Sequence, residues 1–286
     1  MQFTYLNGRY LHKNDCKIST EDRGYNFSDG VYEVISFKNK ILLNYERHLV
    51  RLKKSLSSLN FESPFYNFFS LKIILMNLID INLIRDGFIY LQITRGNAPR
   101  NHLIPKKIKP NIFLSIYPKK NLKTLIAKGV NVITSNDLRW KRCDIKSISL
   151  LPNVLGKQMA YNEGTYELWQ TYDKDIISEG TTSNAFIVKD QNIFTHPQNQ
   201  FILGGITRDI VIKIAREKKI NIIEKKFSLG EVYDSDEAFL TSTTVGVLPV
   251  VKINNKYILN GKIGKITKKI RIFYEDFINN QLKKHE

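Results

Sequence analysis

The sequence predicts an α+β fold made of two domains with mixed sheets. Its 286 residues, of which 42% are apolar and 25% charged, are enough for two hydrophobic cores of ordinary size. Helical and strand patterns are mixed in both halves, but they do not follow the strict strand–helix alternation of a parallel sheet. The pattern weakens between residues 118 and 128. This weakening indicates the connection between a domain at 1–120 and a domain at 121–286.

The first half opens with a hairpin pattern. Asn7-Gly8 is a dipeptide favoured in two-residue turns, because both positions tolerate positive φ, and strand-like residues flank it. Residues 30–44 alternate apolar and polar positions and turn near Asn39, which predicts a second extended segment. The other elements predicted from apolar spacing are helices at 46–59 and 65–84 and strands at 88–94 and 111–117.

The second half contains a helix with clear end signals. Pro152 suits its first turn, where the missing N–H costs nothing, and Gly164 suits the residue just past its end. The remaining predicted elements are strands at 130–134, 165–172, 183–189, 191–197, 221–227 and 237–243, helices at 207–219 and 264–282, a short helix after Ser228, and a hairpin at 249–258.

The net charge of +17 raises nucleic acid or an anionic membrane surface as partners. The basic residues, however, occur in small scattered groups and form no arginine-and-aromatic stripe on which bases could stack. The chain is also rich in Asn and Ile, so a lysine-biased composition explains the charge. We therefore expect no nucleic-acid partner.

The same composition predicts a cytoplasmic protein without a membrane partner. The N-terminal residues show no charged-then-apolar leader, and the most apolar stretch is interrupted by Asn77 and Asp80. Cys16 and Cys143 are far apart, which favours reduced thiols over a disulfide framework.

Lys146 has a setting that could make it chemically special. A polar, basic approach ends at Ile145, and an apolar helix with Pro152 in its first turn follows almost at once. A lysine between an extended segment and a core helix is anchored on rigid elements with its amine near the apolar interior, where it can act as a nucleophile or a base. An ordinary lysine with a solvated amine fits the same pattern.

Residues 203–209, LGGITRD, form a pattern typical of phosphate binding. Gly204 and Gly205 let the backbone approach a ligand closely, and Thr207 is predicted to cap the helix that follows, so that N–H groups and a hydroxyl converge at a helix N-terminus. A simple turn with a threonine cap fits equally. The cluster TSTT at 241–244 could add further donors or be only a turn.

Two further polar segments could serve a ligand. Glu179 lies at a strand end in SEGTTSNAF, where it is either an exposed turn residue or a partner for a cationic ring nitrogen. Arg95, Arg100 and His102 share the turn-rich segment 95–105 and would suit a substrate carboxylate, although a solvated basic loop has the same composition. No HExxH, CxxC or carboxylate cluster is present, so we expect no metal.

Together these features are the parts that pyridoxal phosphate needs to act on an amino acid. The sequence also resembles the class IV aminotransferases of pyridoxal-phosphate fold type IV, most closely the D-amino-acid aminotransferases. The resemblance covers nearly the whole chain in the order of the motifs EDRGYNFSDGVYEV, ERHLVRL, IYLQITRGNAPRNH, DLRWKRCDIKSISLLPNVLGKQ, SEGTTSNAF, THP, ILGGITRD and TSTT. It implies a small N-terminal domain and a larger C-terminal domain with the cofactor between them.

The resemblance also implies the catalytic roles. Lys146, in the DIKS motif, would form the internal aldimine with pyridoxal 5'-phosphate and then move the α-proton as base and acid. Glu179 matches the glutamate that keeps the pyridine nitrogen protonated. The other cofactor-binding residues implied are Arg51, Ile206, Thr207 and Thr243 for the phosphate and Leu203 for the ring.

For the substrate, the resemblance implies a carboxylate site made of Tyr32, Arg100 and His102. In D-amino-acid aminotransferases the loop with the arginine and the histidine comes from the partner subunit, which implies a homodimer. The expected reaction is D-alanine with 2-oxoglutarate to pyruvate and D-glutamate; the alternatives on this fold are a branched-chain L-amino-acid aminotransferase and an aminodeoxychorismate lyase. Ser149 and Val245-Gly246 depart from the family pattern at positions that could alter the substrate pocket.

Overall fold

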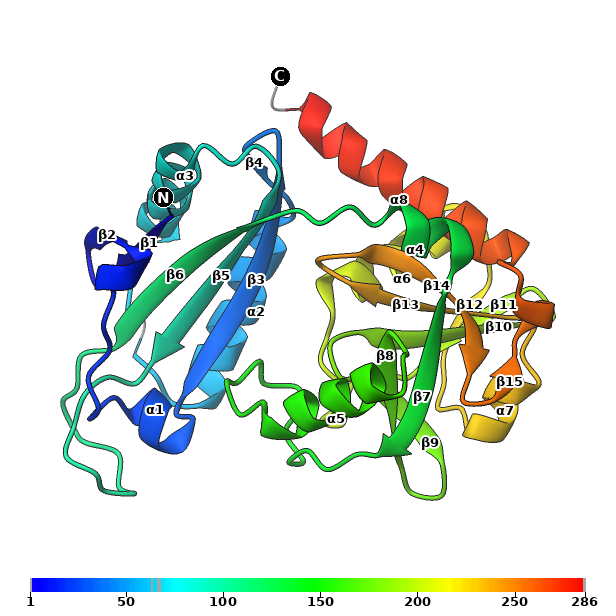
Figure 1. The fold of residues 1–286 in the computed structure, drawn as a ribbon, viewed down its shortest axis with the longest axis horizontal. Coiled ribbons are helices and arrows are strands. Elements are labelled where there is room, and N and C mark those ends of the chain that lie inside the picture. Colours follow the sequence, from blue (N-terminus) through cyan, green and yellow to red (C-terminus); the bar gives the residue numbers. More distant parts are fainter. Residues whose placement is uncertain (1, 63, 66–67, 285–286) are drawn as a thin grey trace. The chain divides into compact units, whose positions relative to one another are not determined.

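The computed structural model describes residues 2–62, 64–65 and 68–284, and the chain divides into two compact units (Figure 1). The first unit comprises the described residues up to Lys120 together with Ile145–Ser149. The second comprises Asn121–Asp144 and Leu150–Lys284. The domain boundary between residues 120 and 121 remains a prediction. It would place Ile145–Ser149, which carries Lys146, in the second domain, whereas this segment belongs to the first compact unit.

The first unit is built on a six-stranded sheet with the order β2-β1-β6-β5-β3-β4. All of its neighbouring strands are antiparallel. The strands are β1 (Phe3–Leu6), β2 (Arg9–His12), β3 (Gly30–Lys38), β4 (Ile41–Leu42), β5 (Gly87–Thr94) and β6 (Asn111–Pro118). The hairpin between β1 and β2 turns at Asn7 and Gly8, both with positive φ, as the sequence predicts.

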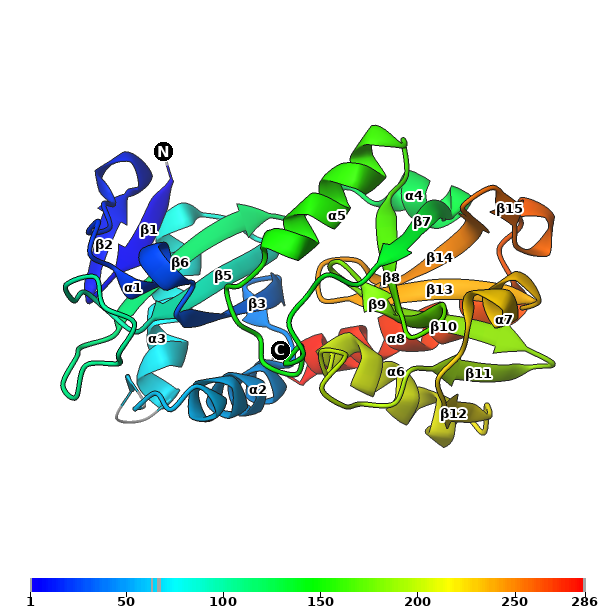
Figure 2. The ribbon, with the colours of Figure 1, turned by 90° about the horizontal axis from the view of Figure 1, so that it is seen from below.

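Helices α2 (Tyr45–Ser58) and α3 (Phe68–Asn82) pack against this sheet (Figure 2). Leu49, Leu52 and Leu56 are buried at helical spacing on α2 and share one core with Val31, Ile35 and other residues of the sheet. The unit also contains a 3-10 helix, η1 (Lys13–Asp15), and the short helix α1 (Arg23–Phe27). The predicted helix at 65–84 corresponds to α3, with residues 66–67 outside the described residues.

The second unit is built on a mixed nine-stranded sheet. Its order is β12-β11-β10-β13-β14-β7-β8-β9, with β15 paired to β14. The strands are β7 (Val130–Asn136), β8 (Glu167–Tyr172), β9 (Ile176–Gly180), β10 (Asn184–Lys189), β11 (Asn192–Thr195), β12 (Ile222–Glu224), β13 (Glu237–Ser242), β14 (Gly246–Ile253) and β15 (Lys256–Tyr257). The sheet curls, because β9 at its edge also contacts β10.

Both faces of this sheet are covered. Phe239 of β13 packs with Val211 of helix α6 (Ile206–Glu217) and Ile270 of helix α8 (Lys265–Lys283). Its neighbours Ala238 and Leu240 belong to the core on the opposite face. The helices of the unit are α4 (Lys123–Lys128), α5 (Leu151–Asn162), α6 (Ile206–Glu217), α7 (Leu229–Tyr233) and α8 (Lys265–Lys283), with the 3-10 helix η2 (Leu259–Gly261). None of the described helices is long and apolar enough to cross a membrane.

Helix α5 corrects one expectation. Pro152 lies in its first turn and Gly164, at φ 63°, follows its C-terminus, as predicted. It is not a core helix, however, because Ala160 is its only buried residue. Its other apolar side chains include four exposed ones, Leu151, Val154, Leu155 and Met159. The helix therefore presents an apolar face that the described part of this chain does not cover.

Besides the two 3-10 helices, three elements escaped the sequence pattern. Helix α1 is short and is capped by the side chain of Asp22, which accepts a hydrogen bond from the N–H of Tyr25. Helix α4 lies in the segment expected to be a connection. Strand β9 carries Ser178 and Glu179 on a buried strand, where polar residues obscure the strand signal.

Candidate active site

The backbone around Lys146 is fastened to β3 and α2. Strand β4 pairs only with the far end of β3, so the edge at residues 30–32 is open to another segment. There the N–H of Tyr32 donates to the carbonyl of Lys146 (2.9 Å), and the N–H of Ile148 donates to the carbonyl of Gly30 (3.1 Å). The N–H of Lys146 donates to Oγ of Ser55 on α2 (3.2 Å). Only the side chain of Lys146 is left to move.

The amine of Lys146 lies next to a residue that the resemblance assigns to the substrate. Its Nζ is 4.1 Å from the centre of the Tyr32 ring. Tyr32 is on the opposite face of β3 from the buried residues Val31 and Glu33, and its ring is 5.6 Å from that of Tyr90. The structure therefore brings together Lys146 and Tyr32, two of the predicted site residues in the first unit.

Arg51 is held by a carboxylate that faces α2 from β3. Glu33 is fully buried and accepts hydrogen bonds from Nε (2.7 Å) and Nη2 (2.8 Å) of Arg51. Its Oε2 is also 2.8 Å from Nδ1 of His48. His48 and Arg51 are three residues apart on α2, so one face of the helix presents both to Glu33. This paired geometry orients the Arg51 guanidinium.

The charges of this group are settled by their contacts. Burial would raise the pKa of Glu33, but the Arg51 guanidinium outweighs burial and holds that pKa well below its usual range. Burial lowers the pKa of His48 against the opposing effect of Glu33. His48 is therefore neutral near pH 7, and its Nδ1–H donates to the Glu33 carboxylate.

Arg100 and His102 form a second group in the first unit. Both side chains are exposed, on the loop after β5. The Arg100 guanidinium is 5.1 Å from the centre of the Phe27 ring, and the His102 ring is 5.3 Å from it. The two predicted carboxylate-binding side chains are thus gathered around one aromatic residue.

Arg95 does not belong with them. Its side chain is buried, and its guanidinium donates to Oδ2 of Asp29 (2.8 Å) and to the carbonyls of Leu59 and Asn60. The expectation that Arg95 would share a substrate site with Arg100 and His102 is therefore wrong. All of these contacts are internal to the first unit and serve its folding.

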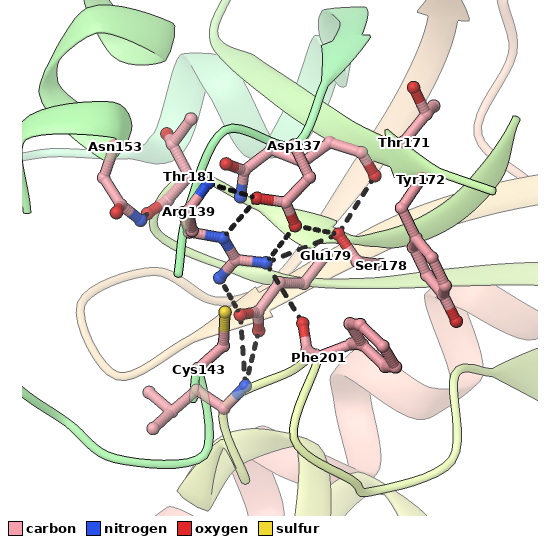
Figure 3. Close-up of polar contacts among 12 residues, drawn as sticks. Asp137, Arg139, Cys143, Asn153, Thr171, Tyr172, Ser178, Glu179, Thr181 and Phe201 are labelled. Carbon is pink, nitrogen blue, oxygen red and sulfur yellow. Dashed lines mark hydrogen bonds and ion pairs between the residues drawn. The ribbon is translucent and has the colours of Figure 1, made fainter. Parts of the chain in front are cut away.

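In the second unit, Glu179 is the centre of a buried polar network (Figure 3). Its carboxylate accepts hydrogen bonds from the N–H of Leu203 (3.1 Å to each oxygen) and from Nδ2 of Asn184 (2.8 Å). Arg139 forms an ion pair with it. Glu179 and Leu203, which the resemblance assigns to the cofactor nitrogen and ring, are thus joined directly.

Arg139 is shared between two carboxylates. Its Nη2 is 2.7 Å from Asp137, and its Nη1 pairs with Glu179. Burial would lower the pKa of Arg139, but both carboxylates outweigh it and raise that pKa. At Asp137, Arg139 overcomes the effect of burial and lowers the pKa. At Glu179 burial prevails and raises the pKa, although Arg139 opposes it.

The N-terminus of α6 carries the predicted phosphate-binding residues and corrects one detail. The N-cap is Gly205, and it has no side-chain cap hydrogen bond. Thr207 lies inside the first turn, so it is not the cap; helix geometry begins one residue earlier, at Ile206. A side chain at Gly205 would clash, since its Cβ would lie 2.0 Å from Oδ1 of Asn184.

Thr243 lies in the turn between β13 and β14 and is half-buried. The strand before it leaves a polar atom unsatisfied: Oγ1 of Thr241 is buried without a hydrogen-bond partner among the described residues. Thr241 is the register partner of Asn184, whose side chain reaches both Glu179 and the carbonyl of Leu203. A buried donor and acceptor of this kind is costly unless a ligand or water satisfies it.

Sequence reasoning missed Glu33, Arg139 and Asn184 as parts of the site. The sequence contained a clear indication for Glu33, a weak one for Arg139 and none for Asn184. Glu33 interrupts an otherwise apolar face of an alternating strand, which indicates a buried charge with a partner, and His48 and Arg51 share one helix face. Arg139 had only its place two residues after Asp137, and Asn184 had no signal beyond its strand position.

Comparison with known proteins identifies the family of the chain. The family model described as amino-transferase class IV matches residues 30–253. D-alanine aminotransferase of Bacillus licheniformis is 40% identical over 279 residues, which is 98% of this chain and 98% of that protein. The enzyme of the same name from Staphylococcus epidermidis is 37% identical over 281 residues, 98% of this chain and 99% of that protein.

Among solved structures, the branched-chain amino acid aminotransferase of Escherichia coli has a TM-score of 0.88 at 23% identity, covering 97% of this chain and 94% of that one. A branched-chain amino acid aminotransferase solved with pyridoxamine 5'-phosphate has a TM-score of 0.89 at 22% identity, with the same coverage of both chains. At this identity the likeness establishes the fold, which is the two-unit α+β fold of the fold type IV aminotransferases. Because the family model covers most of the chain and the relatives align along nearly all of it, the chain belongs to the class IV aminotransferases.

Proposed function

We propose that this chain is a pyridoxal-phosphate-dependent transaminase of D-amino acids, which moves the amino group of D-alanine to 2-oxoglutarate and yields pyruvate and D-glutamate. The observation that carries the proposal is the similarity to D-alanine aminotransferases along nearly the full length of both proteins. The likeness to branched-chain aminotransferases supports the fold alone.

The residues of the second unit fit this cofactor. Glu179 is a buried carboxylate that shares Arg139 with Asp137, so a protonated ring nitrogen would supply a further positive partner. The first turn of α6 has no side-chain cap, which leaves backbone N–H groups suited to a phosphate. Ile206, Thr207 and Thr243 would hold the phosphate, and Leu203 would pack against the ring.

In the first unit, Lys146 has the properties needed for attachment and proton transfer. Bound pyridoxal phosphate withdraws electrons from the α-carbon of the substrate and so makes its proton removable. Both the N–H and the carbonyl of Lys146 are hydrogen-bonded, which fixes its backbone. The amine can then change position only by rotation of the side chain, so it stays close to the reacting atoms. We assign to Nζ the covalent attachment of the cofactor, the removal of the α-proton and its return.

Arg51, in the first unit, is the side chain that we assign to the cofactor phosphate there. Glu33 orients its guanidinium through two hydrogen bonds, and a group oriented in this way loses less entropy when it binds. Tyr32, Arg100 and His102 would receive the α-carboxylate of the substrate. Arginine suits that task, because its planar guanidinium matches a carboxylate with two parallel hydrogen bonds.

We further propose a homodimer in the cytoplasm. The apolar face of α5, which the described part of this chain leaves exposed, supports a contact with a second copy. Cys16 and Cys143 are both free, which fits a reducing compartment.

Mixing two inactive variants tests whether the loop of one subunit serves the site of the other. Lys146→Ala and Arg100→Ala subunits, unfolded and refolded together, should regain about one quarter of wild-type activity, since half of randomly paired dimers are mixed and each has one intact site. Each variant refolded alone is the control. No recovery in the mixture would contradict a loop shared across subunits.

The absorption spectrum of the purified protein tests the proposed reaction. A visible cofactor band should disappear on adding D-alanine and return with 2-oxoglutarate, while L-leucine should leave it unchanged. If L-leucine alone removes the band, the branched-chain L-specific activity replaces the D-specific one. If no band forms even after pyridoxal phosphate is added, the proposal fails altogether.

A further inference from the structure

A buried arginine on α1 holds the loop that carries Arg100 and His102. Nη1 of Arg23 donates to the carbonyl of Asn101 (2.6 Å) and, at 3.3 Å, to the carbonyl of Leu103. These carbonyls flank His102 on both sides. Nε of Arg23 donates to Oδ2 of Asp29 (2.9 Å), and only 3% of the residue is exposed. One guanidinium therefore ties the backbone on either side of His102 to the first unit.

The aromatic residue at the other end of α1 holds the side chains of the same loop. The Phe27 ring centre is 4.8 Å from the Arg23 guanidinium, 5.1 Å from that of Arg100 and 5.3 Å from the His102 ring. A guanidinium over an aromatic face is attracted by the ring and loses rotational freedom. Phe27 thus restrains both side chains proposed to receive the substrate carboxylate.

Helix α1 is a firm support for these contacts. Asp22 caps it at the N–H of Tyr25 (3.1 Å) and accepts a second hydrogen bond from Oγ1 of Thr94 on β5 (2.6 Å). Gly24 packs so tightly on β5 that a Cβ there would lie 2.3 Å from Cγ2 of Thr94. The N–H of Arg23 donates to the carbonyl of Gly96, where the loop begins (2.9 Å). The helix and the start of the loop are therefore one body.

We propose that Arg23 and Phe27 are positioning residues for the substrate carboxylate, an inference that rests on the proposed function of Arg100 and His102. Residues 99–104 are exposed, and residues 95–110, all of them described, contain no helix or strand. Without these contacts, Arg100 and His102 would have to be ordered when the substrate binds, at a cost in affinity. With them the carboxylate site is formed in advance, and neither residue needs to touch the substrate.

The chain offers matched control residues. Arg95 is as buried as Arg23 and bonds the same Asp29 oxygen, but its other contacts are the carbonyls of Leu59 and Asn60. Tyr25 is an aromatic residue on the same helix with its side chain exposed. Arg23→Lys is therefore compared with Arg95→Lys, and Phe27→Leu with Tyr25→Leu.

The first readout separates carboxylate binding from chemistry. The decrease of the cofactor absorption band is titrated with D-alanine, which gives the dissociation constant. In a separate experiment, the rate at which the band disappears is measured with hydroxylamine, which has no carboxylate. Phe27→Leu and Arg23→Lys should raise the dissociation constant for D-alanine by about 10-fold, the effect of losing one charge-assisted contact, with hydroxylamine rates unchanged. The controls should bind D-alanine as wild type does. Unchanged D-alanine affinity in Phe27→Leu would overturn the proposal, even if Arg23→Lys fails to fold.

The second readout does not depend on activity. Trypsin cleaves after Arg100, and the loop should be cut faster in Phe27→Leu and Arg23→Lys than in their controls, because a loosened loop fits the protease more readily. Equal cutting would overturn the proposal on its own. If wild type fails to respond to D-alanine while the cutting rates differ as expected, the proposed function is wrong but the loop anchor stands.

Discussion

Two buried carboxylates, Glu33 in the first unit and Glu179 in the second, differ in how they pair with arginine. Glu33 takes two hydrogen bonds from Arg51, with His48 as a third partner. Glu179 pairs with Arg139, which is divided between it and Asp137. Accordingly Arg51 outweighs burial and lowers the pKa of Glu33, whereas burial raises the pKa of Glu179.

The difference supports the distinct roles proposed for the two carboxylates. A carboxylate whose charge is balanced within the fold can orient another residue, as Glu33 orients Arg51. A buried carboxylate that shares its cationic partner with a second carboxylate is stabilised more by a cationic ligand. We therefore assign Glu33 to positioning and Glu179 to the cofactor nitrogen, although both are almost fully buried.

The largest effect should come from Glu179→Gln. The variant cannot balance a protonated ring nitrogen, so kcat should fall by about 10²–10³-fold, the scale of losing one electrostatic partner at a reacting centre. Arg139 keeps Asp137 as a partner, so the free energy of unfolding should change little. Steady-state kinetics and urea unfolding check the two parts. Wild-type kcat in this variant would remove the distinction drawn between the carboxylates.

Glu33→Gln should have the opposite profile. It leaves Arg51 without its buried counter-charge, which should lower the free energy of unfolding by about 3 kcal/mol, as for other broken buried pairs. The affinity for pyridoxal phosphate should fall because Arg51 is no longer oriented, while kcat at saturating cofactor should be affected less than in Glu179→Gln. Urea unfolding and cofactor titration measure both quantities. A stability loss smaller than that of Glu179→Gln would reverse the assignment.

A smaller effect should appear in the pH dependence of the cofactor-free protein. The lowered pKa of Glu33 stabilises the fold above the ordinary glutamate pKa, and this contribution is lost as pH falls. The raised pKa of Glu179 means that the folded protein binds this proton more tightly, so stability falls as pH rises through the interval above the ordinary value of about 4.3.

The two variants should therefore diverge in opposite directions. Below about pH 5, the stability of wild type relative to Glu33→Gln should rise with pH, and above about pH 4 its stability relative to Glu179→Gln should fall. Urea unfolding at several pH values gives both slopes. Slopes of the same sign would show that the two carboxylates share one environment.

Much of the fold was predictable because its signals are local. The helix expected at 46–59 is α2 (Tyr45–Ser58), and the strands expected at 88–94 and 111–117 are β5 and β6 within one residue at each end. Helix α1 was not predictable from spacing, because it has only five residues and depends on tertiary contacts with Thr94 and Gly96. The exposure of α5 was missed because an apolar pattern does not reveal what covers it.

The site was predictable in its identities but not in its connections. The resemblance named Lys146, Glu179 and Arg51, and their assigned roles remain proposals. Sequence alone did not reveal that Glu33 forms an ion pair with Arg51 or that Asp137 and Glu179 both pair with Arg139. It also did not reveal that Arg95 is buried and paired with Asp29. The contacts of Arg51 with Glu33, of Arg139 with Glu179 and of Arg95 with Asp29 join residues 18 or more positions apart, so no local pattern encodes them. Asp137 lies only two residues before Arg139, but their spacing does not show that Glu179 shares the same guanidinium.

Whether Lys146 attaches the cofactor can be tested by reducing the cofactor-loaded protein with borohydride, which makes a lysine–cofactor bond permanent, and mapping the labelled peptide by mass spectrometry. We expect a pyridoxyl-phosphate label on Lys146 and on no other lysine, with the label absent when D-alanine is added before reduction. A label on a different lysine, or no label in a protein that has taken up the cofactor, would show that Lys146 does not attach the cofactor.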